Sequence, residues 1–118
     1  MLYTGLTCKL KNKMNTEEFV KAFYKEKRDF LTEYLSENPE SEVGQLIKTL
    51  NLTDQQTETM KRIMDGTLTD TFYTILLGLD GCASIGGIQE MYELKDENGN
   101  QLSGEIEGYA YEYFHEKE

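Results

Sequence analysis

The segment Gly78–Gly87 contains the residues of this chain whose types and spacing could do chemistry. Asp80, Cys82 and Ser84 alternate there with other residues between glycines. A cysteine or a serine can act as a nucleophile when a base lies beside it, and the only histidine in the sequence is His115. Asp80, Cys82 and Ser84 therefore form a candidate ligand-binding or catalytic loop, which depends on a distant segment for its base.

The same segment has a simpler structural interpretation. A phosphate-binding loop needs a lysine after its glycines, which is lacking here, and Asp80 would repel a bound anion. Gly78 instead suits the end of a helix, and Gly86 with Gly87 suits the entry to a strand. Cys82 then serves as a small buried apolar side chain. Because no catalytic motif is present, we expect a protein that is not an enzyme, and the loop remains an alternative site.

Metal-binding chemistry lacks a sufficient set of ligands. A structural zinc site needs about four ligands, whereas the sequence has two cysteines, Cys8 and Cys82, and one histidine. The segment Asp96–Asn100 alternates oxygen-bearing side chains as a calcium loop does, but Gly99 is misplaced and no glutamate closes the loop. We therefore expect neither a metal nor a cofactor.

Acidic and aromatic residues dominate the C-terminal part of the chain. The segment from Ile106 to Phe114 has a helical apolar stripe, so its carboxylates should face outward. Carboxylates around an exposed tyrosine suit the docking of a basic protein, because charge steers the encounter and an aromatic ring anchors it. An ordinary solvated helix face is the alternative. The candidate partner-binding residues are Asp96, Glu97, Glu105, Glu107, Tyr111 and Glu112.

Charge is unevenly distributed along the sequence. Residues 1–28 hold seven Lys or Arg and three Asp or Glu, whereas residues 29–118 hold five and nineteen, and the net charge is −10. Such a molecule repels nucleic acids and anionic membranes and attracts cationic partners. The seven basic residues between Lys9 and Arg28 are only a weak candidate for nucleic-acid binding, because the acidic remainder of the chain would repel a nucleic acid. We expect a basic protein partner, no nucleic acid and no membrane.

Size and composition are those of one globular domain. The 118 residues are 38% hydrophobic, which is enough for a core, and we expect a single domain over 1–118. Residues 1–10 lack the pattern of a secretory signal, and the longest apolar run, Ile75–Leu79, is too short to span a bilayer. These observations, with both cysteines expected as reduced thiols, predict a cytoplasmic protein.

Capping residues and apolar periodicity predict four to five helices. Asn15 caps the first helix, whose apolar stripe is interrupted at residues 25–28. Thr53 and Gln56 form a capping box for a later helix, which Gly66 should end. The expected helices cover about 16–35, a segment that starts near Pro39 and carries an apolar face up to Leu50, about 54–65, a segment up to Leu79 and a last segment from about Ile106.

Three segments suggest strands. Apolar residues alternate over 2–10 and appear on one face over 88–95, and the Asn98-Gly99 pair favours a tight turn before a return strand at about 100–103. The predicted fold class is α+β and mainly helical, with four to five helices packed against a small antiparallel sheet or hairpin.

In size, acidity and lack of catalytic equipment, the chain is similar to small bacterial inhibitor and immunity proteins, some of which neutralise a basic toxin or nuclease through an acidic surface. The similarity is one of composition and carries no motif. It implies an acidic, soluble protein-binding module. The first alternative is a small enzyme or ligand-binding domain with its site at Gly78–Gly87. The second is a structural homo-oligomer in which Met60, Met64 and the Phe72–Leu79 helix pack against another copy.

Overall fold

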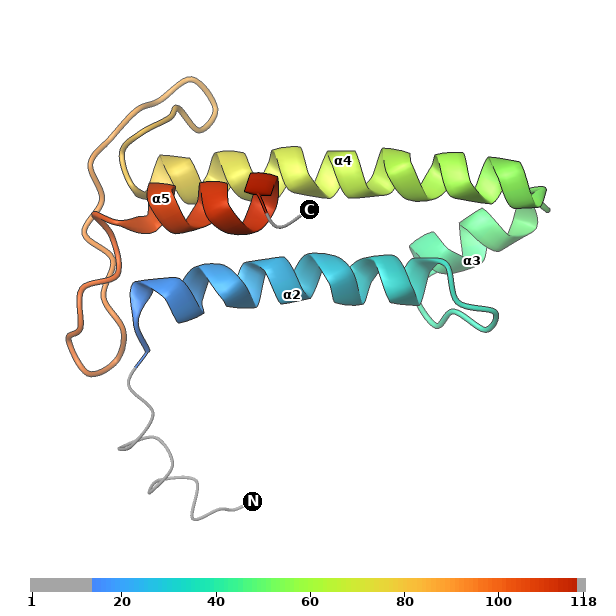
Figure 1. The fold of residues 1–118 in the computed structure, drawn as a ribbon, viewed down its shortest axis with the longest axis horizontal. Helices are drawn as coiled ribbons and strands as arrows, with labels where there is room; N and C mark the ends of the chain where they lie inside the picture. The colour runs from blue at the N-terminus through green and yellow to red at the C-terminus, as the bar shows by residue number, and fades with distance from the viewer. Residues whose placement is uncertain (1–13, 117–118) are drawn as a thin grey trace, which may run out of the picture.

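The computed structural model describes residues 14–116, which contain four α-helices, one π-helical turn and a long non-helical segment between α4 and α5. Figure 1 shows α2 and α4 side by side along the length of the molecule. α3 joins them at one end, and α5 packs beside both at the other. The elements are α2 Thr16–Tyr34, α3 Glu42–Thr49, α4 Asp54–Leu79, α5 Ile106–Tyr111 and the π-helical turn η1 Glu112–Glu116.

Side-chain caps begin α2, α3 and α4. The Asn15 side chain accepts a hydrogen bond from the Glu18 N–H at 2.8 Å, as predicted. The capping box of α4 is also confirmed, because Thr53 and Gln56 each accept a hydrogen bond from the other's N–H, at 3.1 and 2.9 Å. Ser41 caps α3, so that helix begins at Glu42, three residues after Pro39. These local hydrogen bonds satisfy donors that a helix start leaves unpaired.

α4 is one helix of 26 residues, so the predicted break at Gly66 is wrong. Gly66 keeps right-handed helical geometry, and the Thr67 and Thr71 hydroxyls donate to carbonyls one turn earlier, at 2.8 Å each, instead of capping a new helix. A glycine costs a helix only about 1 kcal/mol, and the apolar face that continues across it offsets this cost. That face consists of Met60, Met64, Leu68, Phe72 and Leu76.

The predicted α+β class is also wrong, since no sheet forms among residues 14–116. The segments 88–95 and 100–103 share only an isolated bridge between Lys95 and Gln101. Pairing stops there because the Ser103 side chain accepts the Leu94 N–H at 3.0 Å, and a two-stranded pair alone is marginal in water. The strand expected over 2–10 lies outside the described residues.

Gly86 and Gly87, expected at the entry to a strand, form a two-residue turn. Their φ values of 60° and 85° lie in the left-handed region, which favours glycine and gives the turn type typical of tight hairpins. The flanking residues Ile85 and Ile88 exchange backbone hydrogen bonds of 2.9 and 3.1 Å. The turn therefore closes on itself, without a neighbouring strand.

The apolar core lies where α5 and η1 pack against α2 and α4 (Figure 1). The rings of Tyr24 and Phe114 meet edge to face, with centroids 5.6 Å apart. Aromatic pairs of this geometry stabilise a core beyond the burial of their area. The buried cluster consists of Val20, Leu76, Ile106, Ala110, Tyr113 and Phe114.

Lys27 is buried inside the apolar stripe of α2, with only 2% of its surface exposed. Its Nζ lies 2.9 Å from Asp65 Oδ1 and donates to Thr69 Oγ1 at 3.1 Å. The same Nζ lies 5.0 and 5.5 Å from the ring centroids of Tyr24 and Phe114. The ion pair and the two rings offset the lost hydration of the ammonium group, so this lysine continues the stripe that it was expected to interrupt.

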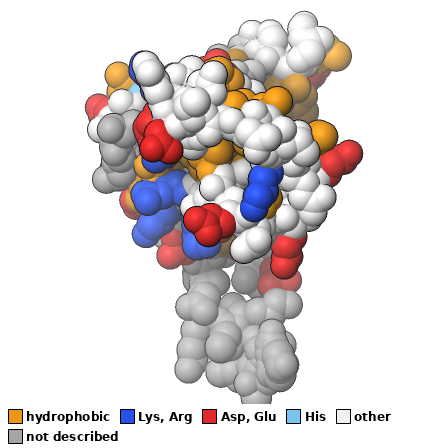
Figure 2. All heavy atoms as spheres, turned by 90° about the vertical axis from the view of Figure 1, so that its right-hand side faces the viewer, with side chains coloured by type: hydrophobic (Ala, Val, Ile, Leu, Met, Phe, Trp, Pro, Cys, Tyr) orange, Lys and Arg blue, Asp and Glu red, His pale blue; other side chains and the backbone are white. Residues whose placement is uncertain are grey.

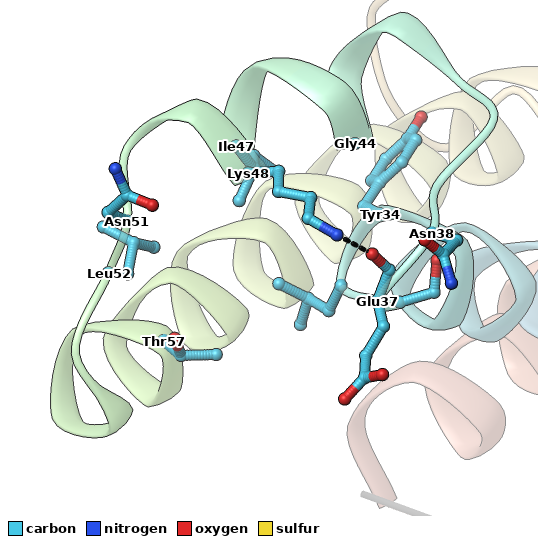
Figure 3. A pocket seen from close by; sticks show the side chains of 11 residues that line it. Tyr34, Glu37, Asn38, Gly44, Ile47, Lys48, Asn51, Leu52 and Thr57 are labelled. Atoms are coloured by element: carbon cyan, nitrogen blue, oxygen red, sulfur yellow. Dashed lines mark hydrogen bonds between the residues drawn. The ribbon is translucent and has the colours of Figure 1, made fainter.

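The α3 end is held mainly by polar contacts and small side chains. Gly44 packs directly on the Pro39 ring, which occupies the space that a larger side chain would need. The Glu33 carboxylate accepts hydrogen bonds from the Glu40 N–H at 2.6 Å and from Ser41. A hollow of about 420 Å³ remains between α3 and the adjoining ends of α2 and α4, and Figure 3 shows Lys48 bonded to the Glu37 carbonyl at its rim.

Candidate functional site

Asp80 follows the last residue of α4 and ties that helix to α5. Its side chain is buried, with the residue 7% exposed. Both carboxylate oxygens accept backbone hydrogen bonds, one from the Gly104 N–H and the other from the Glu107 N–H at 3.0 Å. A carboxylate at the start of a helix satisfies free donors and interacts favourably with the helix dipole. Asp80 therefore acts as the cap of α5.

The rest of the predicted ligand loop offers little room or reactivity. Ile85 fills the space above Gly78, while Cys82 and Ser84 are exposed. Loss of some hydration raises the pKa of the Cys82 thiol, as does its contact with the Glu107 carboxylate, whose Oε1 lies 3.5 Å from Sγ. A raised pKa keeps the thiol protonated and a poor nucleophile. The geometry thus disfavours the alternative enzyme or ligand site.

The turn at 96–100 uses one of its predicted docking carboxylates internally. Asp96 Oδ1 accepts from the N–H groups of Asn98 and Asn100 at 2.9 and 2.8 Å, and Oδ2 accepts from the Asn100 side chain at 2.9 Å. Such a turn is a common role for aspartate. Glu97, at the tip of the turn, is exposed.

Glu107 and Tyr111 lie together on the side of α5 that adjoins the end of α4. Glu107 contacts Cys82, and Tyr111, 50% exposed, lies beside His115 with ring centroids 5.5 Å apart. His115 in turn meets the ring of Tyr73 from α4 edge to face at 4.4 Å. This arrangement gives an exposed carboxylate and an exposed tyrosine, one turn apart, over a supporting layer of rings.

Glu105 lies on a different side, beside the start of α2. It lines an open hollow of about 450 Å³ together with Glu17 and Tyr109. The nearby Tyr113 hydroxyl donates to Glu17 at 2.9 Å, which raises the pKa of Tyr113. Glu112, half-buried, begins η1. The six predicted docking residues therefore share one end of the molecule, but they are distributed over more than one of its faces.

Sequence reasoning missed an exposed apolar loop at the same end. Ile88, Met91 and Tyr92 are 61%, 80% and 42% exposed, although Ile88 and Tyr92 were expected on the apolar face of a strand. Met91 rests against Gly81, and the Gln89 side chain donates to the Gly81 carbonyl at 2.8 Å. The sequence offered one signal for this loop. Two consecutive glycines at 86–87 are as typical of a tight turn as of the entry to a strand.

Comparisons with protein-family models, with curated proteins and with solved structures give no match to this chain. Within residues 14–116, no group of three or more His, Cys, Asp or Glu side chains is placed to hold a metal ion. No helix in that range has the length and apolarity needed to cross a membrane. The site must therefore be judged on its geometry and charge alone.

Proposed function

We propose that this chain is a protein-binding module that engages a basic protein through its acidic end, where α5 meets the end of α4. The observation that carries the proposal is the exposure of large apolar side chains among carboxylates. Tyr111 stands beside Glu107, and the loop with Met91 carries Glu90 and Glu93. Protein interfaces typically combine such apolar anchors with a polar rim.

The charge of this end supports a cationic partner. Residues 78–116 contain nine Asp or Glu and one Lys. A concentration of one sign of charge raises association rates with an oppositely charged protein and repels polyanions. Partner and chain would then meet quickly, and the exposed side chains of Met91 and Tyr111 would prolong the complex.

The sharpest form of the proposal is inhibition of a basic toxin or nuclease. Such a partner binds phosphates with Lys and Arg side chains, and carboxylates presented at the same spacing would occupy those cations. Covering a phosphate-binding surface in this way blocks substrate without any chemistry by the inhibitor. The similarity in size and acidity to immunity proteins agrees with this form.

The test begins with affinity capture from the native host by the wild-type chain, followed by mass spectrometry. Association of the captured protein is then measured with Glu107→Lys/Glu112→Lys and with the control Glu26→Lys/Glu58→Lys, which changes the net charge equally at two exposed positions outside this end. The proposal expects at least a tenfold slower association for the first variant only, and a steep loss of wild-type binding with added salt.

Two results would overturn the proposal. One is an equal effect of the two double variants, which would mean that net charge alone and not this end governs binding. The other is a salt-insensitive complex whose partner is acidic. If the partner is a nuclease or toxin, its activity with and without the chain separates inhibition from mere binding.

A further inference from the structure

The apolar face of α4 discriminates only weakly between alternative alignments of α4 along α2. The two helices run antiparallel along the length of the molecule (Figure 1). The face repeats an apolar side chain every four residues, in the order Met60, Met64, Leu68, Phe72 and Leu76. A slide of α4 by one turn would put each of these side chains in the place of the next, so an apolar face would still meet α2.

The structure nevertheless shows one alignment of the two helices. The ring of Phe72 lies near those of Phe23 and Phe30 from α2, with centroids 5.8 and 6.4 Å away. Leu76 is fully buried. This face of α4, which the sequence offered for a homo-oligomer, is therefore used within the chain.

Lys27 meets α4 and η1 inside this interface. Its Nζ lies 2.9 Å from Asp65 Oδ1 and donates to Thr69 Oγ1 at 3.1 Å. That oxygen of Asp65 is buried, although the side chain as a whole is 37% exposed. The ring centroid of Phe114 from η1 lies 5.5 Å from the same Nζ. A charge in such a place depends on its partner, because an ammonium group held away from water is costly unless it is paired.

The residues at one-turn intervals around Asp65 include only one carboxylate. Lys61 precedes Asp65 by one turn, and Thr69 and Tyr73 follow it. A slide of α4 in one direction would put Lys61 in the place of Asp65 and bring two cations together. A slide in the other direction would put Thr69 there and withdraw the carboxylate from the buried ammonium. Both slides are therefore disfavoured by charge, although the apolar face tolerates them.

We propose that the Lys27–Asp65 ion pair locks the register of α2 against α4 and so selects one packing of the helix pair. A single buried polar side chain can fix the register of a coiled coil in the same way, at some cost in stability. The apolar side chains then provide most of the packing energy, and the ion pair decides which alignment receives it.

The acidic end depends on the same register. The Thr16 hydroxyl at the start of α2 donates to the Leu102 carbonyl at 2.9 Å. Asp80, which follows α4, accepts a hydrogen bond from the Gly104 N–H. Residues 102–104 are thus tied to both helices, and a slide of one helix along the other would pull these two anchors apart.

Spin labels on the two helices measure the register directly. The labels are attached at Glu26→Cys in α2 and Glu58→Cys in α4, two exposed positions, in a background of Cys8→Ser and Cys82→Ser. Double electron–electron resonance should give a single distance between the labels when the ion pair is intact. A slide by one turn displaces that distance by up to about 5 Å, the pitch of the helix.

Two double variants of the labelled chain test the lock. Lys27→Met/Asp65→Leu replaces the buried ion pair by apolar side chains and should add a second, displaced distance. Lys25→Met/Asp29→Leu is the matched control, because the same substitutions remove an exposed ion pair of 2.7 Å within α2, and it should keep the single distance. One unchanged distance in the first variant, or a second distance in both variants, overturns the proposal.

Asp65→Asn keeps the test decisive if circular dichroism shows that Lys27→Met/Asp65→Leu does not fold. Asparagine retains the size and an acceptor oxygen but removes the charge that distinguishes position 65 from its neighbours one turn away. This variant should also add the displaced distance, whereas Asp29→Asn should not, and a single unchanged distance in Asp65→Asn overturns the lock. None of these measurements needs a partner, so their outcome is independent of the binding proposed for the acidic end.

Discussion

The two ends of the α2–α4 pair are packed in different ways (Figure 1). At one end, α5 and η1 contribute Ile106, Tyr113 and Phe114 to a buried apolar cluster. At the other, α3 directs Gly44 inward and leaves Leu46 and Leu50 outside. A third helix is present in both places, but only α5 with its continuation η1 brings fully buried large side chains to the interior.

The difference teaches that the side chains on the inward face of a helix decide whether the helix becomes part of the core or leaves its apolar stripe exposed. α5 buries Ile106 and continues into η1, which buries two rings, and the Asp80 carboxylate fixes the start of α5, so the exposed groups of this end stand on a well-packed base. α3 is fixed by its cap and by the hydrogen bonds of Glu33, and its largest apolar stripe faces solvent. One end is thus organised around its own core, whereas the other keeps its large apolar side chains at the surface.

The largest effect should come from the core end. Phe114→Ala removes a ring that is 1% exposed, and such truncations cost about 3–5 kcal/mol of unfolding free energy. The companion change Leu46→Ala, at a 59% exposed site, should cost within about 0.5 kcal/mol in dilute monomer. Urea unfolding of both variants measures the contrast. Equal losses would show that the α3 end is packed as tightly as the core end.

The next effect concerns the link between α4 and α5. Asp80→Ala leaves the N–H groups of Gly104 and Glu107 without their acceptor, which should cost about 1–2 kcal/mol. Hydrogen exchange should show faster opening of α5 than of α3. Asp70→Ala, at an exposed position of α4, is the matched control and should have little effect. An unchanged α5 in Asp80→Ala would refute the capping role.

A smaller and opposite effect is expected in the middle of α4. Gly66→Ala should stabilise the protein by about 0.5–1 kcal/mol, because the helix continues through this position and a Cβ there meets nothing within 4 Å. Gly44→Ala should destabilise it, because its Cβ would overlap the Pro39 ring. Thermal unfolding of the two variants compares them. A loss on Gly66→Ala would indicate a hinge between the two ends.

The smallest effect is the pH response of the α3 end. Hydrogen bonds from Ser41 and Glu40 lower the pKa of the Glu33 carboxyl. Its stabilising contribution is therefore complete above the ordinary glutamate pKa and is lost as the pH falls through the lowered value. Amide chemical shifts of Glu40 and Ser41 should follow that titration and lose it in Glu33→Gln. A response spread equally over α5 would contradict a local origin.

Local chemistry made some of the fold predictable from sequence. The caps at Asn15 and Thr53 depend on neighbours three residues away, and both were found as expected. The helix end predicted at Gly66 was wrong because a glycine ends a helix only where the apolar face that packs on the core also ends. The apolar four-residue repeat through Met64 and Leu68 was the competing signal, and it prevailed.

Tertiary contacts explain what sequence alone could not provide. Lys27 was expected to interrupt the apolar stripe of its helix, but it is buried in that stripe beside Asp65 and a ring from η1, both far away along the chain. Composition identified the acidic end. Which of its carboxylates share a face depends on the orientation of α5, and the Asp80 hydrogen bonds to Gly104 and Glu107 help to set that orientation. The strand expected over 88–95 would have needed a partner strand, which the described residues lack.

The unbroken α4 helix fixes the distance between the two surfaces. Its 26 residues span about 39 Å at the usual rise per residue. A span of 30 Å is about the diameter of a small domain. One small globular partner therefore could not cover the acidic end and the exposed stripe of α3 at the same time, and a substitution at one end can be tested without touching a partner bound at the other.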